Sequence, residues 1–411
     1  MKKPSSRLFK ILYAGMFLVA ILTFSAPSVV TAWRSLQADA KGASFAKTIS
    51  KALVDEFPLH DRFIDLYGGL MRILGRRLCN GTVRTTDGRL MRESGHRDVR
   101  PFADALKREV ERLSGTPFLF VPAPDCVDRC QRCLPHGLHA EANRCARELM
   151  DALEDMGIES LNLEDCLADT PESVLRHYYK TDHHWNCLAS RKVAALVTER
   201  ICRRLEVDVG DVQALFLDDR NWVSHTVKNA WLGRLGARVG RYFDGLDDFT
   251  WYTTVRKSRM SSSIDSGAPR RGDFNSIAVS ERCLKSLGCY HKVTGAFGGT
   301  PDLVWGGRCR GTKTFVNEDA PIDRRIVVVK DSFGRSVAAC MVLAFREVIL
   351  LDPRYLAKGA SLRDAVWDSH PDMVVEIVSA GWVAAPIGRR IGAPESYNWK
   401  FFKWKSGCGK P

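Results

Sequence analysis

Beyond Trp33, the 411-residue sequence has no second apolar run long enough to cross a lipid bilayer. Its later apolar runs, such as residues 326–329 and 374–377, are short and have charged residues close by. The chain after residue 35 is therefore expected to form a soluble body, which excludes a protein with several membrane-spanning helices. With 45% hydrophobic residues, that body can bury a sizeable core.

Patterns that hold common metal ions are also missing. The sequence contains no H-E-x-x-H motif and no Cys/His zinc spacing. Basic residues form no single stripe, because the 61 Lys and Arg residues are scattered in small groups among 48 Asp and Glu. The net charge of +13 then has two interpretations. It attracts acidic lipid headgroups or acidic wall polymers, or it only keeps the surface solvated.

The N-terminus is where apolar residues are concentrated. Four basic residues among the first ten precede an almost uncharged stretch from residue 11 to about 33. Its length is nearer to the ~20 residues of a bilayer span than to the ~7–15 of a signal peptide's apolar region. We predict a retained cell-membrane anchor, with a cleaved signal and a secreted protein as the alternative, because residues 30–32 fit a cleavage site. The basic flank places the body outside the cytoplasm, away from nucleic acid.

Cysteine is abundant for an exported protein. Thirteen are present, so at least one is unpaired within a monomer, and an oxidising compartment would favour disulfides among the rest. Cys126, Cys130 and Cys133 have the C-x3-C-x2-C spacing that radical enzymes use for an iron–sulfur cluster. Loop-forming residues surround them, and an exported chain lacks the usual route for loading a cluster. Disulfides or a small metal knot are favoured, with the connectivity open.

Amphipathic helical patterns alternate with short apolar strand patterns over most of the body. One example is a helix at 99–115 followed by a strand at 117–124. This alternation predicts an α/β fold with a parallel sheet covered by helices on both faces. We assign residues 1–35 to the anchor or signal and 36–411 to one extracytoplasmic domain. Residues 207–320 contain a long Gly-, Pro- and Ser-rich stretch and are expected to be a loop-rich insertion or lid with little regular structure.

Ser332 is the best candidate for a nucleophile. It lies in "IVVVKDSFG", at the end of a buried strand and just before a helix, where open parallel sheets bind ligands. The helix N-terminus supplies unpaired N–H groups, and Gly334 lets the backbone approach closely, so the Ser332 N–H is a candidate oxyanion donor. The alternative is that Asp331 or Ser332 only caps the helix.

A serine nucleophile needs a base, and the base needs an orienting carboxylate. The stretch "KTDHHWN" offers both in Asp182 and His184. In extended chain, residues two apart point the same way, so these two are expected to share a side while His183 faces the other. Asp182 would then hold one ring nitrogen of His184 and leave the second for Ser332.

A metal site competes for the same residues. His177, Asp182, His183 and His184 are all metal-ligand types, and "DHH" also names a class of manganese phosphoesterases. Those enzymes need further aspartate motifs earlier in the chain, and adjacent histidines in extended chain point apart. The sequence therefore predicts no metal and no cofactor, with metal chemistry as the weaker alternative.

The motif "YYKTDHHWNCLAS", followed later by "VVKDSFG", resembles the DHHW family and the SGNH-hydrolase-like proteins of bacterial alginate O-acetylation. In that group the D-x-H pair precedes the serine turn, a circularly permuted order. Further stretches that resemble the family, including "FPLHDRFIDLYGGLMRILG", "WLGRLGARVGRYFDGLDD" and "EVILLDPRYL", extend the likeness over most of residues 55–380. The chain departs from relatives at Lys330 and in the stretch around Asp125.

The resemblance implies an SGNH-like fold and acyl-group chemistry, most simply acetyl transfer, on an exported polysaccharide or wall polymer. Ser332 would carry the acyl group, His184 would act as base and acid, and Asp182 would orient it. Gly233 or Gly236 is implied as an oxyanion donor, and Arg354 as a support for the site or an anionic substrate. Many relatives receive the acyl group from a membrane-bound O-acyltransferase, so such a partner is implied.

The sequence thus leads to a serine-dependent O-acyltransferase or carbohydrate esterase with the triad Ser332, His184 and Asp182. A non-catalytic cell-envelope protein that binds or assembles polysaccharide remains as an alternative, with a metal-dependent phosphoesterase behind it. Neither the polymer nor the acyl group follows from the residues.

Overall fold

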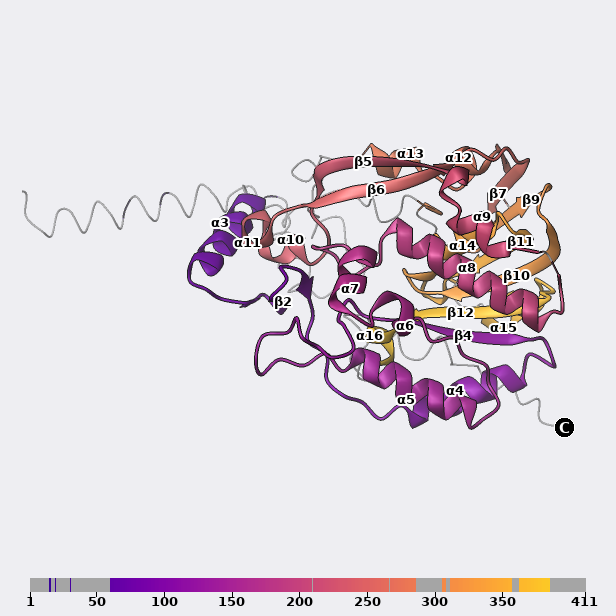
Figure 1. Cartoon of the computed structure of the whole chain (residues 1–411), viewed down its shortest axis with the longest axis horizontal. Helices are drawn as coiled ribbons and strands as arrows, with labels where there is room; N and C mark the ends of the chain where they lie inside the picture. The colour runs from indigo at the N-terminus through magenta and orange to yellow at the C-terminus, as the bar shows by residue number, and fades with distance from the viewer. Residues whose placement is uncertain are drawn as a thin grey trace, which may run out of the picture.

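A seven-stranded sheet forms the centre of the computed structural model (Figure 1). The structure describes residues 60–208, 210–265, 267–285, 305–307, 311–356 and 362–384, together with Gly15, Val19 and Val30. The strand order is β4-β12-β10-β11-β9-β7-β8. The bounds are β4 Phe118–Ala123, β12 Met373–Ser379, β10 Ile322–Lys330, β11 Phe345–Leu351, β9 Lys313–Asn317, β7 Met260–Ile264 and β8 Arg270–Gly272.

Four neighbouring strands, β4, β12, β10 and β11, run parallel. Their residues are apolar on both faces because helices cover the sheet on each side. The strands are in register, with Val329 of β10 opposite Leu351 and Glu376. The carboxyl ends of β4, β12 and β10 therefore meet at one edge of the sheet, as the predicted parallel core requires.

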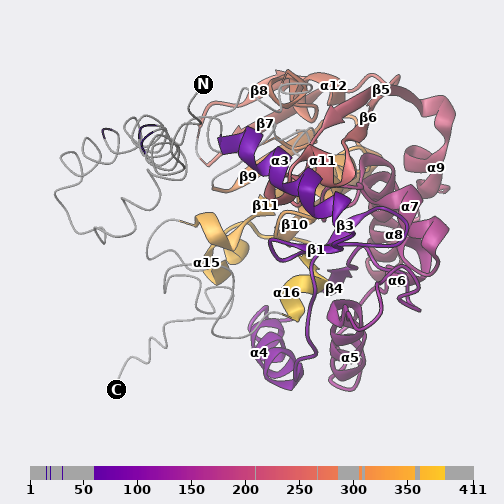
Figure 2. The same ribbon diagram turned by 90° about the vertical axis from the view of Figure 1, so that its left-hand side faces the viewer.

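One face of the sheet is covered by α4 (Arg100–Glu111), α5 (Ala142–Glu154) and α16 (Ala380–Val383), which pack on side chains such as Val327 and Val374. The opposite face is covered by α8 (Cys187–Arg204) and α14 (Gly334–Met341), which pack on Ile326 and Val375. Figure 2 shows α4 and α5 together on their side of the sheet. The prediction of an α/β fold with helices on both faces is confirmed.

The expectation of little regular structure between residues 207 and 320 is wrong for the described part of this segment. It supplies β7, β8 and β9, which extend the central sheet with antiparallel pairings, so the sheet is mixed rather than wholly parallel. It also forms a long two-stranded ribbon of β5 (Trp222–Trp231) and β6 (Asp247–Thr254). The segment is part of the fold, because β9 pairs directly with β11, β7 pairs with β9, and β8 pairs with β7.

Smaller elements gather beyond one end of the sheet (Figure 1). They are a three-stranded sheet and three helices: β1 Leu78–Cys79, β2 Thr82–Arg84, β3 Leu90–Met91, α3 His60–Ile73, α10 Gly236–Val239 and α11 Arg241–Asp244. No helix in the described ranges is both long and apolar enough to span a bilayer. The anchor or signal predicted for residues 1–35 lies outside the described residues, apart from Gly15, Val19 and Val30.

Candidate active site

Ser332 lies where β10 ends and α14 begins, at the edge where the parallel strands finish. Asp331 shapes this turn. One of its carboxylate oxygens accepts the N–H of Phe333 at 2.8 Å, and the other accepts the N–H of Ser379, just past the β12 core, at 2.8 Å. Neither Asp331 nor Ser332 caps α14, whose N-cap is Phe333 without a side-chain cap, and the half-buried Ser332 hydroxyl makes no hydrogen bond to another described residue.

Gly334 starts α14 against the strand ends. A Cβ at this position would lie 2.7 Å from Cβ of Lys330 and 3.0 Å from Cβ of Ile377, closer than real side chains approach. Only glycine lets the helix begin this near the sheet. The first N–H groups of a helix have no partner within it, and α14 begins at Gly334, where the parallel strands end.

Asp182 and His184 form the predicted pair. His184 Nδ1 lies 2.6 Å from Asp182 Oδ1, and the backbone N–H of His184 donates to the same oxygen at 2.9 Å. The second carboxylate oxygen accepts the backbone N–H of Arg234 at 2.7 Å. Burial raises the pKa of Asp182, but the neighbouring imidazoles of His183 and His184 and these hydrogen bonds outweigh it and hold that pKa well below its usual range.

His183 does not face away from this pair, contrary to the expectation for extended chain. Its ring centroid lies 4.0 Å from that of His184, and its Nδ1 is 3.5 Å from Asp182 Oδ1. The reason is that residues 181–184 bend instead of extending. Burial, followed by the charge of His184, lowers the pKa of His183, which favours a neutral imidazole beside the pair.

Phe333 joins the two motifs, which are almost 150 residues apart in the sequence. Its ring centroid lies 4.8 Å from that of His184 and 5.1 Å from that of Trp185. Because Phe333 directly follows Ser332, this packing brings the turn of residues 331–333 (the serine turn) against the turn of residues 181–184 (the histidine turn). His184 Nε2 is buried and has no hydrogen-bond partner, so the histidine is not hydrogen-bonded to Ser332 in this structure. Hydrogen bonds between catalytic groups are often incomplete before substrate binds.

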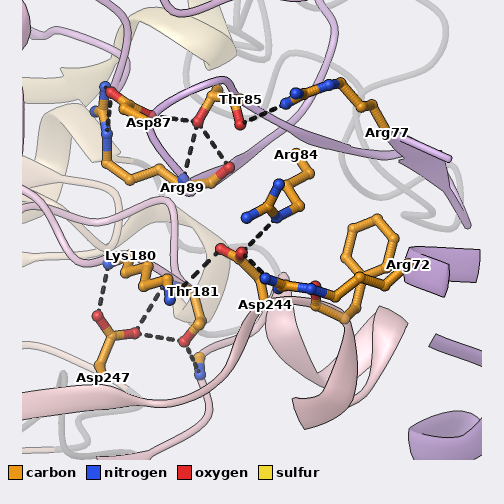
Figure 3. Close-up of polar contacts among 12 residues, drawn as sticks. Arg72, Arg77, Arg84, Thr85, Asp87, Arg89, Lys180, Thr181, Asp244 and Asp247 are labelled. Atoms are coloured by element: carbon orange, nitrogen blue, oxygen red, sulfur yellow. Dashed lines mark hydrogen bonds and ion pairs between the residues drawn. The ribbon is translucent and has the colours of Figure 1, made fainter. Parts of the chain in front are cut away.

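Asp247 binds the start of the histidine turn at Lys180 and Thr181 (Figure 3). The sequence did not predict this role for Asp247. The buried Asp247 carboxylate accepts the backbone N–H groups of Lys180 at 2.6 Å and Thr181 at 2.8 Å, and also the Thr181 hydroxyl. Burial raises the pKa of Asp247 to about 6 despite these bonds. Asp247 is one of several acidic residues in "FDGLDD", and only its position in the fold distinguishes it.

Gly233 and Gly236 pack against the same turn and are not oxyanion donors here. The Gly233 N–H donates to the Thr181 hydroxyl at 2.8 Å, and the Gly236 N–H donates to the Thr181 carbonyl at 2.9 Å. A Cβ at Gly233 would lie 2.5 Å from Cβ of Asp182. These glycines therefore let the chain from β5 to α10 approach Asp182 closely, and their N–H groups are already used.

Arg354 is held by Asp352, just past β11. Its guanidinium contacts both carboxylate oxygens, at 2.7 and 2.6 Å. Asp352 also accepts Nζ of the buried Lys330 at 2.8 Å, which ties the end of β10 to the end of β11. Lys330, at which the sequence departs from its relatives, thus belongs to a buried ion pair beneath the serine turn. Arg354 contacts the same carboxylate.

The mouth of the site is positively charged. Arg92, Arg234 and Arg238 are exposed, and none of them forms an ion pair with another described residue. Arg234 follows Gly233 and donates its backbone N–H to Asp182, so its backbone lies at the edge of the site. An anionic group bound here would relieve the repulsion among the guanidinium groups.

Ligand atoms of Asp182, His183 and His184 lie within 4.8 Å of one another, the one such group of metal-ligand types found among the described residues. Both oxygens of Asp182 are already hydrogen-bonded, and His184 Nδ1 faces one of them. A metal ion would have to displace these bonds, so the geometry fits a hydrogen-bonded pair better than a metal centre.

The cysteines of the described chain form no disulfides. Cys126 and Cys133, which are buried, and Cys130, which is exposed, are all free thiols. The expectation of a disulfide or metal knot in this cluster is therefore wrong for these residues: Cys130 points to solvent, and the three thiols do not form one ligand group. Burial raises the pKa of Cys126, which makes it a core residue rather than a reactive thiol.

Comparison with solved structures identifies proteins with the same arrangement of strands and helices. A DHHW family protein from Eubacterium siraeum superimposes with a TM-score of 0.54 over 76% of this chain and 95% of its own, at 16% sequence identity. The fold is that of a DHHW family protein. PatB1 from Bacillus cereus, in a structure with a sulfonyl adduct, gives a TM-score of 0.55 over 75% of this chain and 98% of its own, at 16% identity.

A second structure of Bacillus cereus PatB1 gives a TM-score of 0.54 at 15% identity. By sequence alone, no family model and no curated protein matches the chain. The DHHW-like fold predicted from the two motifs is thus confirmed by structural likeness, which at these identities speaks for the fold and not for the activity.

Proposed function

We propose that this protein transfers an acyl group, most simply acetyl, to or from carbohydrate hydroxyls through Ser332, His184 and Asp182. Oγ of Ser332 attacks the carbonyl carbon of an ester while Nε2 of His184 takes its proton. The bond from that carbon to the leaving oxygen then breaks, and the leaving oxygen takes the proton from His184. An acceptor hydroxyl, or water in an esterase, reverses these steps and releases the serine.

The observation that carries this proposal is the environment of His184. Its Nδ1 is bound to Asp182 at 2.6 Å, while its Nε2 is buried, without a partner, and on a ring that packs against Phe333 next to Ser332. His177 is also buried with one ring nitrogen unpartnered, but among the described histidines His184 alone combines this with a carboxylate on its other nitrogen and a ring packed beside the serine turn. The PatB1 neighbour carries a sulfonyl adduct, and sulfonyl groups attach to nucleophilic side chains, which supports a nucleophile on this fold.

The oxyanion that forms on the ester carbonyl needs N–H donors. The backbone N–H groups of Ser332, two residues before α14, and of Gly334, its first residue, supply them in this proposal, with the partial positive charge of the helix terminus. Gly233 and Gly236 have no part in it, since Thr181 takes their N–H groups.

The acceptor in this proposal is an exported polysaccharide or wall polymer, and the arginines at the mouth of the site favour one with anionic groups. The acyl donor would come from a membrane-bound O-acyltransferase, and the N-terminal apolar stretch would hold the body outside the cytoplasm next to that partner. These assignments rest on the sequence of residues 1–35 and on the resemblance stated above.

The test compares wild type with Ser332→Ala on a chromogenic acetyl ester. We expect the substitution to remove hydrolysis down to about the uncatalysed rate, because the acyl-serine cannot form. Ser336→Ala is the matched control: Ser336 is one helical turn further on and bonds Ser190 at 2.7 Å, away from the site. Equal rates for wild type and Ser332→Ala would disprove the triad. Retained polysaccharide binding and complementation with no ester turnover in either protein would favour the non-catalytic alternative.

A metal-dependent phosphoesterase is the second candidate, because Asp182, His183 and His184 could supply three ligand atoms. It predicts metal in elemental analysis and activity abolished by a chelator. Ester hydrolysis that survives chelation and is lost in Ser332→Ala would remove it.

A further inference from the structure

Helix α3 presents its apolar side to solvent and its polar side to the protein. The residues it buries are Asp65 and Gly68. Leu66 remains 64% exposed and Ile73 84% exposed. The outward side chains recur every three or four positions along one face, which we call the α3 stripe: Phe63, Leu66, Tyr67, Leu70, Ile73 and Leu74.

Polar contacts fix this orientation, and Figure 3 shows the one between Arg72 and Asp244. The buried Asp65 accepts the backbone N–H of Arg241 at 2.8 Å and lies 3.1 Å from its guanidinium. Arg72 donates to the carbonyl of Phe243 at 2.7 Å and contacts Asp244, which also binds Arg84. Rolling the helix to bury the α3 stripe would break all of these contacts.

Close backbone packing locks the helix further. A Cβ on Gly68 would lie 1.7 Å from the carbonyl oxygen of Val239, and one on Gly69 would lie 3.1 Å from Cβ of Tyr242. The helix therefore contacts α10 and α11 mainly through glycines and ion pairs, with Met71 as the apolar side chain that packs on the cluster of Val239 and Phe243, while the α3 stripe stays outside. A contiguous apolar stripe held outward in this way marks a surface that another apolar phase covers.

The border of the stripe points to lipid. Arg62 and Arg76, one near each end of the helix, are exposed and form no ion pair with another described residue. Tyr67 and Tyr242 are also exposed on this side. Apolar residues flanked by arginine and tyrosine are typical of helices that lie in the interface of an anionic bilayer. The chain's own apolar stretch, residues 11–33, ends only 26 residues before α3 begins.

We propose that α3 lies flat on an anionic phospholipid bilayer, with the α3 stripe in the boundary between headgroups and acyl chains. This inference rests on the proposed location of the chain at a membrane. It has a consequence for the site: α3 packs on α10, and Gly236 at the start of α10 bonds Thr181 next to Asp182. Docking through α3 would therefore hold the active-site turn in a set orientation to the membrane that delivers the acyl donor.

The experiment uses the full chain reconstituted in vesicles of phosphatidylcholine and phosphatidylglycerol that contain a phosphatidylcholine with a diazirine on its acyl chain. Irradiation yields a carbene that inserts into nearby C–H bonds, and digestion with mass spectrometry locates the lipid adducts. We expect adducts on the α3 stripe at roughly tenfold the yield on Leu217 and Trp367, exposed apolar residues elsewhere in the fold. Asp65 and Gly68 should carry none.

The variant Leu66→Lys/Ile73→Lys should lose these adducts about tenfold, because two ammonium groups would enter the apolar boundary. Leu217→Lys/Trp367→Lys is the matched control and should leave them unchanged. Both double variants should hydrolyse a soluble acetyl ester at the wild-type rate, because Leu66, Ile73, Leu217 and Trp367 are not part of the active site. Adding Ser332→Ala to either double variant should remove hydrolysis without changing its lipid adducts. Failure of the membrane proposal and failure of the catalytic proposal are therefore read from separate measurements.

Three outcomes would overturn the proposal. Adducts confined to residues 11–33 would mean that lipid does not reach α3. A dimer in detergent that Leu66→Lys/Ile73→Lys converts to a monomer, without lipid adducts on α3, would show that a second copy covers the stripe. Intramolecular cross-links between α3 and residues 34–59, again without lipid adducts, would assign the stripe to the chain's own preceding segment.

Discussion

His184 Nδ1 lies 2.6 Å from the carboxylate of Asp182, a residue that is fully buried. The carboxylate also accepts two backbone N–H groups, one from His184 and one from Arg234. The pair is thus built into the backbone of two separate segments. This geometry assigns the proton on Nδ1 to the bond with Asp182 and leaves Nε2 as the base.

Asp182→Asn should keep the fold but lower kcat for a chromogenic acetyl ester by about 10³–10⁴, because an amide can hold the imidazole in the wrong tautomer and cannot stabilise its positive charge. Asp323→Asn, at an exposed position that forms no ion pair within the described part of the chain, is the control and should have no effect. Initial rates over a range of ester concentrations give kcat and KM. A variant with wild-type kcat would show that Asp182 is only structural.

Gly233→Ala should disturb the same pair from the other side. The new Cβ would meet Cβ of Asp182 at 2.5 Å and the Thr181 carbonyl oxygen at 2.6 Å, and neither can move freely in the turn. We expect a loss of about 1–3 kcal/mol in the free energy of unfolding, with a lower kcat. Gly95→Ala is the control, because nothing lies within 4 Å of a Cβ there. Urea unfolding and ester hydrolysis measure both effects.

Glu376 makes stability depend on pH. This β12 residue is 4% exposed and has a carboxylate oxygen without a partner. Burial, reinforced by Glu109 and Asp331, raises its pKa from 4.5 to about 8. The folded protein therefore binds a proton that the unfolded chain has lost, so stability is fully present below about pH 4.5 and falls as pH rises to about 8.

Glu376→Gln should remove this dependence, because the amide stays neutral. At pH 9 it should be more stable than wild type by a few kcal/mol, at about 1.4 kcal/mol per unit of pKa shift, and near wild type at pH 5. Glu93→Gln, at an exposed position, is the control. Urea unfolding between pH 5 and 9 checks this, and parallel curves for wild type and Glu376→Gln would contradict it.

The pair of Lys330 and Asp352 should stabilise the turn that carries Ser332. Lys330→Met leaves the buried Asp352 with Arg354 as its remaining cation, so we expect a loss of about 3 kcal/mol in the free energy of unfolding. The double variant Lys330→Met/Asp352→Leu also removes the buried carboxylate that lost its lysine, and it should recover most of the lost free energy of unfolding. Thermal unfolding of the two variants decides this. A double variant less stable than Lys330→Met would show that the pair contributes through its hydrogen bonds.

The parallel core could be predicted because strands buried on both faces are continuous apolar runs, and β4, β10 and β12 have them. The edge strands β7 and β8 have sequences such as "MSSSI" and "RRG" without that signature. Their strand form depends on pairing with β9 and with each other, so the loop-rich prediction for this segment was wrong.

The sequence by itself determined the Asp182 and His184 pair, because two residues in one turn are brought together by local geometry. It also determined the apolar periodicity of α3. Only the tertiary structure decided that Phe333 places the serine turn against that pair, that Asp247 and Gly233 hold it, and that the α3 stripe faces outward. These facts depend on contacts between residues far apart in the chain, and such contacts exist only once the sheet and its helices have packed.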